Sequence, residues 1–90
     1  MIVVWGRRAQ ADLDEIEAYL QERSPHGAQR IWTRIVERVS TLEQFPRAGR
    51  PSSYPGLREL VVTGTSYIVF YEIVEDSVRI RYILHGRQNR

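Results

Sequence analysis

Residues 57–85 read LRELVVTGTSYIVFYEIVEDSVRIRYILH, and this stretch decides the fold. It holds three runs rich in β-branched and aromatic residues, separated by Gly64-Thr65-Ser66 and by Glu75-Asp76. The runs span residues 57–63, 67–74 and 77–85. Because turns this short join neighbouring antiparallel strands, the stretch predicts a three-stranded antiparallel meander.

The last of these runs alternates in a way that is typical of a strand with one face in the core. Its two sets of side chains are Val78, Ile80, Tyr82 and Leu84 on one face, and Arg79, Arg81, Ile83 and His85 on the other. We expect the first set to enter the core. The second face would then present two arginines and a histidine.

The N-terminal half of the chain predicts a strand followed by helices. Ile2–Trp5 is a short β-branched and aromatic run, and apolar residues then recur at helical spacing from Ala9 to Leu20. Ser24-Pro25 disfavours continuation of this helix beyond Arg23 and suits the start of a second one.

The second helix, expected from Pro25 to about Leu42, carries a broad apolar stripe. Its members are Ala28, Ile31, Trp32, Ile35, Val36, Val39 and Leu42. The stripe covers an arc of roughly 140° on a helical wheel, which exceeds what one neighbouring helix needs. Either the helix lies between its partner helix and a sheet, or part of the stripe is left for another protein.

Together these elements predict an α+β fold in the order β-α-α-β-β-β, with a helical hairpin packed on a small antiparallel sheet. A chain of 90 residues suffices for one small domain, which we expect to span residues 1–90. The absence of cysteine and the presence of two separated histidines predict no metal or cofactor site. No apolar run is long enough for a membrane span, and the N-terminus does not resemble a signal peptide, so we expect a cytoplasmic protein.

The net charge of +2 is small, but the charge is unevenly distributed. All 13 basic residues are arginine, which reflects either codon usage or the suitability of guanidinium groups for phosphate and carboxylate recognition. The first helix is acidic, whereas the chain from Ser77 onward contains arginines and no acid. We therefore expect one acidic face and one basic edge.

Several short motifs follow one another along nearly the whole chain. The first half contains Ala9-x-x-Asp12-Leu13-x-x-Ile16-x-x-Tyr19, Ser24-Pro25, and Ile35 through Leu42-x-x-Phe45-Pro46. The second half contains Gly49-Arg50-Pro51, Gly56-Leu57-Arg58-Glu59-Leu60, Tyr67-Ile68-Val69-Phe70-Tyr71, and Val78-x-Ile80 with Leu84-His85-Gly86-Arg87-Gln88. In this order and spacing, the motifs resemble those of the RelE/ParE superfamily of toxins from bacterial type II toxin–antitoxin systems.

The resemblance implies a toxin that arrests bacterial growth and is neutralised by a cognate antitoxin. In such systems the complex binds operator DNA only through the antitoxin. RelE-like members cleave mRNA on the ribosome without a metal. ParE-like members instead poison DNA gyrase and have no known catalytic residues, so the branch decides between an enzyme and a non-enzymatic poison.

The candidate catalytic residues of the nuclease branch are His85, Arg58, Arg87 and Glu59, with Tyr67 and Tyr82 more remote. Metal-free RNA cleavage needs a base, an acid and cations around one phosphate. Arg58 begins one strand and His85 ends another, so an antiparallel sheet could bring them together. Two departures from the nuclease pattern favour the ParE-like branch: residues 59–61 include no basic side chain, and Ile68 stands where those nucleases commonly carry arginine.

The antitoxin site is predicted on the second helix and on the basic edge. Its members are Trp32, Val36, Val39, Arg79 and Arg81. An antitoxin tail that is disordered when free would fold over the leftover stripe, and its acidic residues would meet the arginines. Alternatively, the sheet covers the entire stripe. A third interpretation, a small nucleic-acid-binding module without toxicity, predicts salt-dependent binding to naked RNA or DNA.

Overall fold

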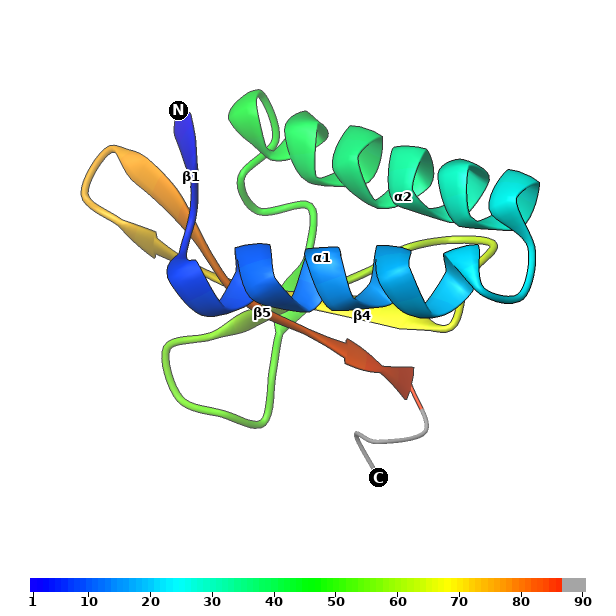
Figure 1. Ribbon diagram of the computed structural model, residues 1–90. Coiled ribbons are helices and arrows are strands. Elements are labelled where there is room, and N and C mark those ends of the chain that lie inside the picture. The colour runs from blue at the N-terminus through cyan, green and yellow to red at the C-terminus, as the bar shows by residue number, and fades with distance from the viewer. Residues whose placement is uncertain (87–90) are drawn as a thin grey trace.

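The computed structural model, which describes residues 1–86, has a layer of two helices packed on a sheet (Figure 1). In chain order, the elements are β1 (Ile2–Trp5), α1 (Arg7–Gln21), α2 (Pro25–Ser40), a 3-10 turn (Thr41–Glu43), β2 (Arg50–Pro51), β3 (Arg58–Val61), β4 (Tyr67–Val74) and β5 (Ser77–His85). The predicted α+β class and the helical hairpin are confirmed.

The sheet has five strands in the order β1-β5-β4-β3-β2, and β3, β4 and β5 form the predicted antiparallel meander. The sequence analysis missed β2, which lies between the second helix and residue 57 and pairs with β3. The sheet, predicted as antiparallel, is mixed, because the first strand, β1, pairs with β5 in parallel. Parallel neighbours need a long connection, and here both helices and three strands lie between them in the chain.

The start of α2 follows from local sequence. The Ser24 hydroxyl accepts a hydrogen bond from the Gly27 N–H at 3.1 Å, and Pro25 occupies the first turn, where a missing N–H costs little. The helical path continues into the 3-10 turn and reaches Glu43, close to the predicted end at Leu42. No helix within residues 1–86 is both long enough and apolar enough to cross a membrane.

The core lies between the helices and one face of the sheet. Leu13 of α1 and Ile35 and Val39 of α2 are buried there against sheet residues that include Tyr71 and Ile80. Burying side chains of this size contributes about 2 kcal/mol each. The centre of the α2 stripe is therefore used by the fold itself.

A β-bulge interrupts the regular alternation of β5. Phe70 and Tyr71 are adjacent in β4, yet their partners in β5 are Tyr82 and Ile80, so Arg81 is an extra residue between them. One extra residue exchanges the two faces of a strand, because side chains alternate with a period of two.

The predicted faces of β5 are accordingly wrong beyond the bulge. Ile83 enters the core with 5% of its surface exposed, whereas Tyr82 and Leu84 lie half-buried on the opposite face. His85, two residues after Ile83, shares the helix-facing side with it. The predicted face bearing two arginines and a histidine therefore does not form.

Tyr71 fixes the loop that leads into β2. Its hydroxyl donates to the Pro46 carbonyl at 2.7 Å and accepts from the Gly49 N–H at 3.0 Å. An added Cβ at Gly49 would lie 2.8 Å from the ring and hydroxyl of Tyr71, so this close approach requires glycine. The loop is thereby held against the start of β3, where Arg58 lies.

Candidate functional site

Arg58, at the start of β3, holds this loop in place. Its Nε and one terminal nitrogen donate to the Gly49 carbonyl at 3.1 and 2.6 Å, and the same terminal nitrogen donates to the Arg47 carbonyl at 3.3 Å. The bonds to Gly49 are partly buried. A phosphate that used these donors would have to displace the loop backbone from them.

Glu59, the next residue, is engaged in an ion pair with Arg50. The Arg50 Nε lies 2.5 Å from Glu59 Oε1, and 10% of the Glu59 side chain is exposed. The pairing of β2 with β3 places the two residues opposite each other. Because side chains alternate along a strand, Glu59 and Arg58 point to opposite faces, so they do not act on the same group.

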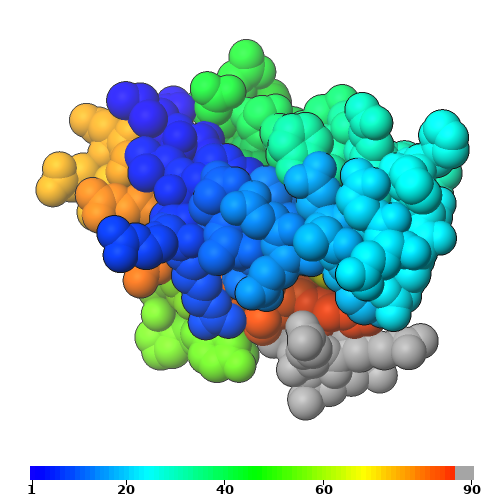
Figure 2. Space-filling model, in the orientation of Figure 1, coloured from blue at the N-terminus to red at the C-terminus, as the bar shows by residue number. Residues whose placement is uncertain are grey.

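His85 lies at the end of β5, in a groove between α1 and the turn that joins β3 to β4. It is opposite Tyr67, and the two rings meet edge to face with centroids 5.5 Å apart. Asp12 and Tyr19 line the α1 side of the groove. In Figure 2, the end of β5 emerges at the surface beneath α1.

Tyr67 and Tyr82, the more remote candidates, remain protonated at neutral pH. Burial, and secondarily Tyr19, raises the pKa of Tyr67. Burial and then Tyr54 raise the pKa of Tyr82, while Arg8, 4.6 Å from the centre of its ring, acts in the opposite direction. A tyrosine with a pKa above its usual value near 10 does not serve as a general base at pH 7.

The described candidates do not converge on one point. Arg58 lies opposite Tyr71, whereas His85 lies opposite Tyr67, on the other side of β4. The four residue steps from Tyr67 to Tyr71 span about 13 Å of strand. The meander itself causes this separation, because β3 and β5 run in the same direction and the start of one is far from the end of the other. Arg87, the remaining candidate, lies outside the described residues, and within residues 1–86 no three His, Cys, Asp or Glu side chains form a group that could hold a metal ion.

The predicted antitoxin contacts divide between two sides of the molecule. Trp32 and Val36 lie half-buried at the margin of the core, but Val39 is 1% exposed and so offers no surface to a partner. Arg79 and Arg81 are exposed on the sheet face that points away from the helices. A partner that touches both sets has to pass around an edge of the sheet.

The basic edge is also less isolated than the sequence suggests. Glu72 of β4 lies opposite Arg79, and its Oε1 lies 3.9 Å from a terminal nitrogen of Arg81. Arg79 Nε donates to the Ser77 hydroxyl at 3.4 Å. Strand pairing thus supplies an acid that is absent from the chain after Ser77.

Asp12 makes a structural contact beside the candidate site that sequence reasoning missed. Its Oδ2 accepts a hydrogen bond from the Ile83 backbone N–H at 2.9 Å, although 71 positions separate the two residues. This N–H lies beyond the part of β5 that β1 covers. The carboxylate therefore takes the place of a missing strand partner.

A second missed feature is a row of three arginines on α2, which we call the arginine row: Arg30, Arg34 and Arg38. Their spacing of four residues places them along one side of a helix, and this regularity was visible in the sequence. Arg34 donates to the Thr63 carbonyl at 2.9 Å, and Arg38 donates to the Val61 carbonyl at 3.3 Å. The row therefore borders the free edge of β3.

Comparison with known proteins gives consistent matches over nearly the whole chain. Residues 3–90 match the family described as the ParE toxin of the type II toxin–antitoxin system, parDE. Toxin RelE2 of Caulobacter vibrioides is 39% identical over 84 residues, with 93% of each chain covered. Toxin RelE3 of the same organism is 33% identical over 87 residues, with 94% of each chain covered. A solved structure of the chromosomal ParDE toxin–antitoxin system from P. aeruginosa superposes with a TM-score of 0.87 at 32% identity, covering 94% of this chain and 95% of that one.

The shared fold and these matches define a small α+β toxin of the RelE/ParE superfamily. The chain belongs to the ParE toxin family of type II toxin–antitoxin systems. The resemblance seen in the sequence motifs is thereby confirmed. Because the relatives carry both RelE and ParE names, the mode of action has to be argued from the residues.

Proposed function

We propose that this toxin arrests bacterial growth as a ParE-like, non-enzymatic poison of DNA gyrase. The observation that carries the proposal is the separation of the candidate nuclease residues. Arg58 is engaged with loop carbonyls, and Glu59 is paired with Arg50 on the opposite face. His85 lies about 13 Å farther along β4 from Arg58.

The chemistry of RNA cleavage explains why this separation matters. A base at the 2′-hydroxyl, an acid at the leaving oxygen and cations at the phosphate must all reach one nucleotide, at hydrogen-bond distances of about 3 Å. A poison that stabilises a complex of another enzyme has no such requirement. It needs a rigid surface that binds its target, and the packed hairpin and sheet supply one.

The proposed partner that keeps the toxin inactive is a cognate antitoxin. Trp32 and Val36 provide half-buried apolar surface on α2, and Arg79 and Arg81 provide exposed guanidinium groups on the other side of the sheet. An extended antitoxin tail, disordered when free, would reach from one set to the other. Operator DNA would be bound through the antitoxin.

The test compares two targets with the same purified toxin. We expect the toxin to inhibit supercoiling by gyrase and to accumulate cleaved plasmid complexes, and to leave ribosome-bound mRNA intact. His85→Ala should inhibit gyrase to within about twofold of the unaltered toxin, because His85 has no chemical step to perform in this mode. Gln21→Ala, at an exposed site at the end of α1 that lies outside the groove of His85 and away from the arginine row, is the matched control.

Two outcomes would reject the proposal. If the toxin cleaves ribosome-bound mRNA, and His85→Ala loses this activity while Gln21→Ala keeps it, the protein is a RelE-like nuclease. If neither target is affected and expression is harmless, but naked nucleic acid is bound with strong salt dependence, the protein is a binding module.

A further inference from the structure

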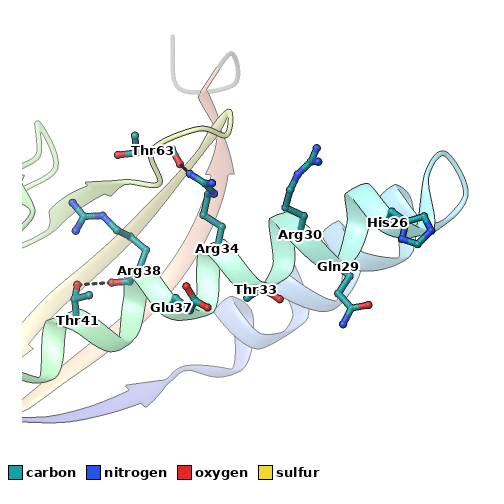
Figure 3. A pocket seen from close by; sticks show the side chains of 9 residues that line it. All are labelled: His26, Gln29, Arg30, Thr33, Arg34, Glu37, Arg38, Thr41 and Thr63. Atoms are coloured by element: carbon teal, nitrogen blue, oxygen red, sulfur yellow. Dashed lines mark hydrogen bonds between the residues drawn. The ribbon is translucent and has the colours of Figure 1, made fainter.

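The arginine row forms a continuous basic surface on α2. Successive members lie about 6 Å apart along the helix axis. Figure 3 shows the three side chains leaving the helix on the same side. They border a groove between α2 and the end of β3, whose other lining residues are His26, Gln29, Thr33, Glu37, Thr41 and Thr63.

Contacts with the end of β3 and with the turn that follows it hold two of the three arginines in place. Arg34 donates to the Thr63 carbonyl at 2.9 Å and Arg38 donates to the Val61 carbonyl at 3.3 Å. A carbonyl oxygen is neutral, so these bonds orient the guanidinium groups without cancelling their charge. Each guanidinium has five N–H donors in all, and most of them stay available to a ligand.

The row also keeps an excess of positive charge. The ion pairs within residues 1–86 are Arg8–Asp12, Arg50–Glu59 and Arg81–Glu72, and none of them involves the row. Glu37 is the acid that shares the groove. Three arginines against one glutamate leave an excess of two positive charges, which favours an anionic ligand.

The remaining lining residues favour one kind of anion. Among the described residues of the groove, none is aliphatic, Phe, Tyr or Trp, the His26 imidazole is the one aromatic ring, and three threonine hydroxyls and the Gln29 amide are present. A protein tail needs an apolar anchor, and an unpaired nucleic-acid strand needs aromatic side chains for its bases to stack on. Backbone phosphates of a duplex need only arginines with hydroxyl and amide donors.

We propose that the arginine row binds the phosphate backbone of duplex DNA. This inference rests on the proposed function, since the DNA would be the duplex that gyrase holds, and it adds a direct toxin–DNA contact to the toxin–gyrase contact. Contacts of this kind carry no sequence preference and fix the position of a protein on the duplex. They are also sensitive to salt, because each one releases bound counterions.

The test measures binding of the full-length toxin, freed of antitoxin, to a fluorescent duplex of about 25 base pairs at several salt concentrations. Three phosphate contacts predict a slope of about −2.7 for the logarithm of affinity against the logarithm of salt concentration. Arg30→Ala should make the slope shallower by about 0.9 and weaken binding roughly 5- to 10-fold near 0.1 M salt. Arg7→Ala, an exposed site in α1 outside the groove with the same change of charge, should leave the slope unchanged.

Three results would overturn the inference: equal losses of duplex affinity in Arg30→Ala and Arg7→Ala, tighter binding of a single strand than of the duplex, or displacement of the duplex by a glutamate-rich peptide at equal charge.

A parallel gyrase assay separates this inference from the proposed function. If the slope changes as expected but the toxin does not inhibit gyrase, the DNA surface stands and gyrase poisoning fails. If gyrase is inhibited and Arg30→Ala changes neither the affinity for the duplex nor its salt dependence, gyrase poisoning stands and the DNA surface fails.

Discussion

The free edges of β3 and β5 both have backbone groups without a strand partner, and side chains of opposite charge bind these groups at the two edges. Each strand extends beyond the short strand that covers it, which leaves backbone groups without a partner. At the end of β3 and in the turn that follows it, the exposed groups are the carbonyls of Val61 and Thr63, and arginines of α2 donate to them. At β5 the exposed group is the Ile83 N–H, and the Asp12 carboxylate accepts from it. Because an uncovered strand edge can pair with a strand of another chain, both sets of contacts oppose such pairing.

The two edges differ in what remains after the backbone is satisfied. The Asp12 side chain is 19% exposed, and Arg8 Nε lies 3.6 Å from the same carboxylate oxygen, so the β5 edge is partly buried and electrically balanced. The β3 contacts are exposed, and the described acids form no ion pair with the row. The β5 contact therefore serves stability, whereas the β3 contacts leave charge that is available for binding.

Among the changes that distinguish the two edges, we expect Asp12→Ala to have the largest effect on the free energy of unfolding. This change leaves a partly buried N–H without its charged acceptor, which should lower the free energy of unfolding by about 2 kcal/mol in urea denaturation. Asp14→Ala is the control: it lies in the same helix, is exposed, and accepts a hydrogen bond from Gln10 at 3.1 Å. Both changes gain the same helix propensity, and the ion pair with the exposed Arg8 side chain contributes little, so the difference between the two variants mainly reports the edge contact. Equal stabilities of the two variants would show that the β5 edge does not depend on Asp12.

Elements of the fold that depend on nearby residues could be predicted from the sequence. The Ser24-Pro25 boundary, the helical spacing of apolar residues and the short turns of the meander all act within a few positions. The bulge at Arg81 could not be predicted, because it is a mismatch between two paired strands that each look regular alone. The parallel pairing of β1 with β5 likewise depends on how the completed layers meet.

The candidate site was less predictable than the fold for the same reason. Arg58 and His85 were correctly placed at strand ends, but the direction of the meander puts those ends far apart. Val39 followed the helical pattern of its neighbours, yet its angular position lies at the centre of the buried stripe and not at the margin. Asp12 had no distinguishing local feature, since its importance comes from an edge amide 71 positions away.

We expect an intermediate loss of stability for Gly64→Ala, in the turn where Arg34 contacts Thr63. Gly64 has a φ of +85°, and an added Cβ would lie 2.6 Å from a terminal nitrogen of Arg34. Gly56, with a φ of +82° and no atom within 4 Å of an added Cβ, is the matched control. Backbone strain should cost about 1 kcal/mol in both alanine variants, measured by thermal unfolding. Gly64→Ala should cost about 0.5 kcal/mol more, because the guanidinium must leave its carbonyl, and this excess should vanish when Arg34 is also alanine. An excess that persists there would mean that Arg34 is not held by this turn.

The smallest effect is expected for Arg38→Gln at the β3 edge. Its bond to the Val61 carbonyl is exposed, so water replaces the lost donor and the free energy of unfolding should fall by no more than about 0.5 kcal/mol. Arg30→Gln, one member of the same row with the same loss of charge, should be neutral by the same measurement. A loss at Arg38 as large as that expected for Asp12→Ala would mean that the fold depends equally on both edges, and the arginine row would then be explained by stability alone. A small loss at Arg38, together with none at Arg30, means that these two arginines are not needed for folding, and their position on one helix face is then better explained by binding.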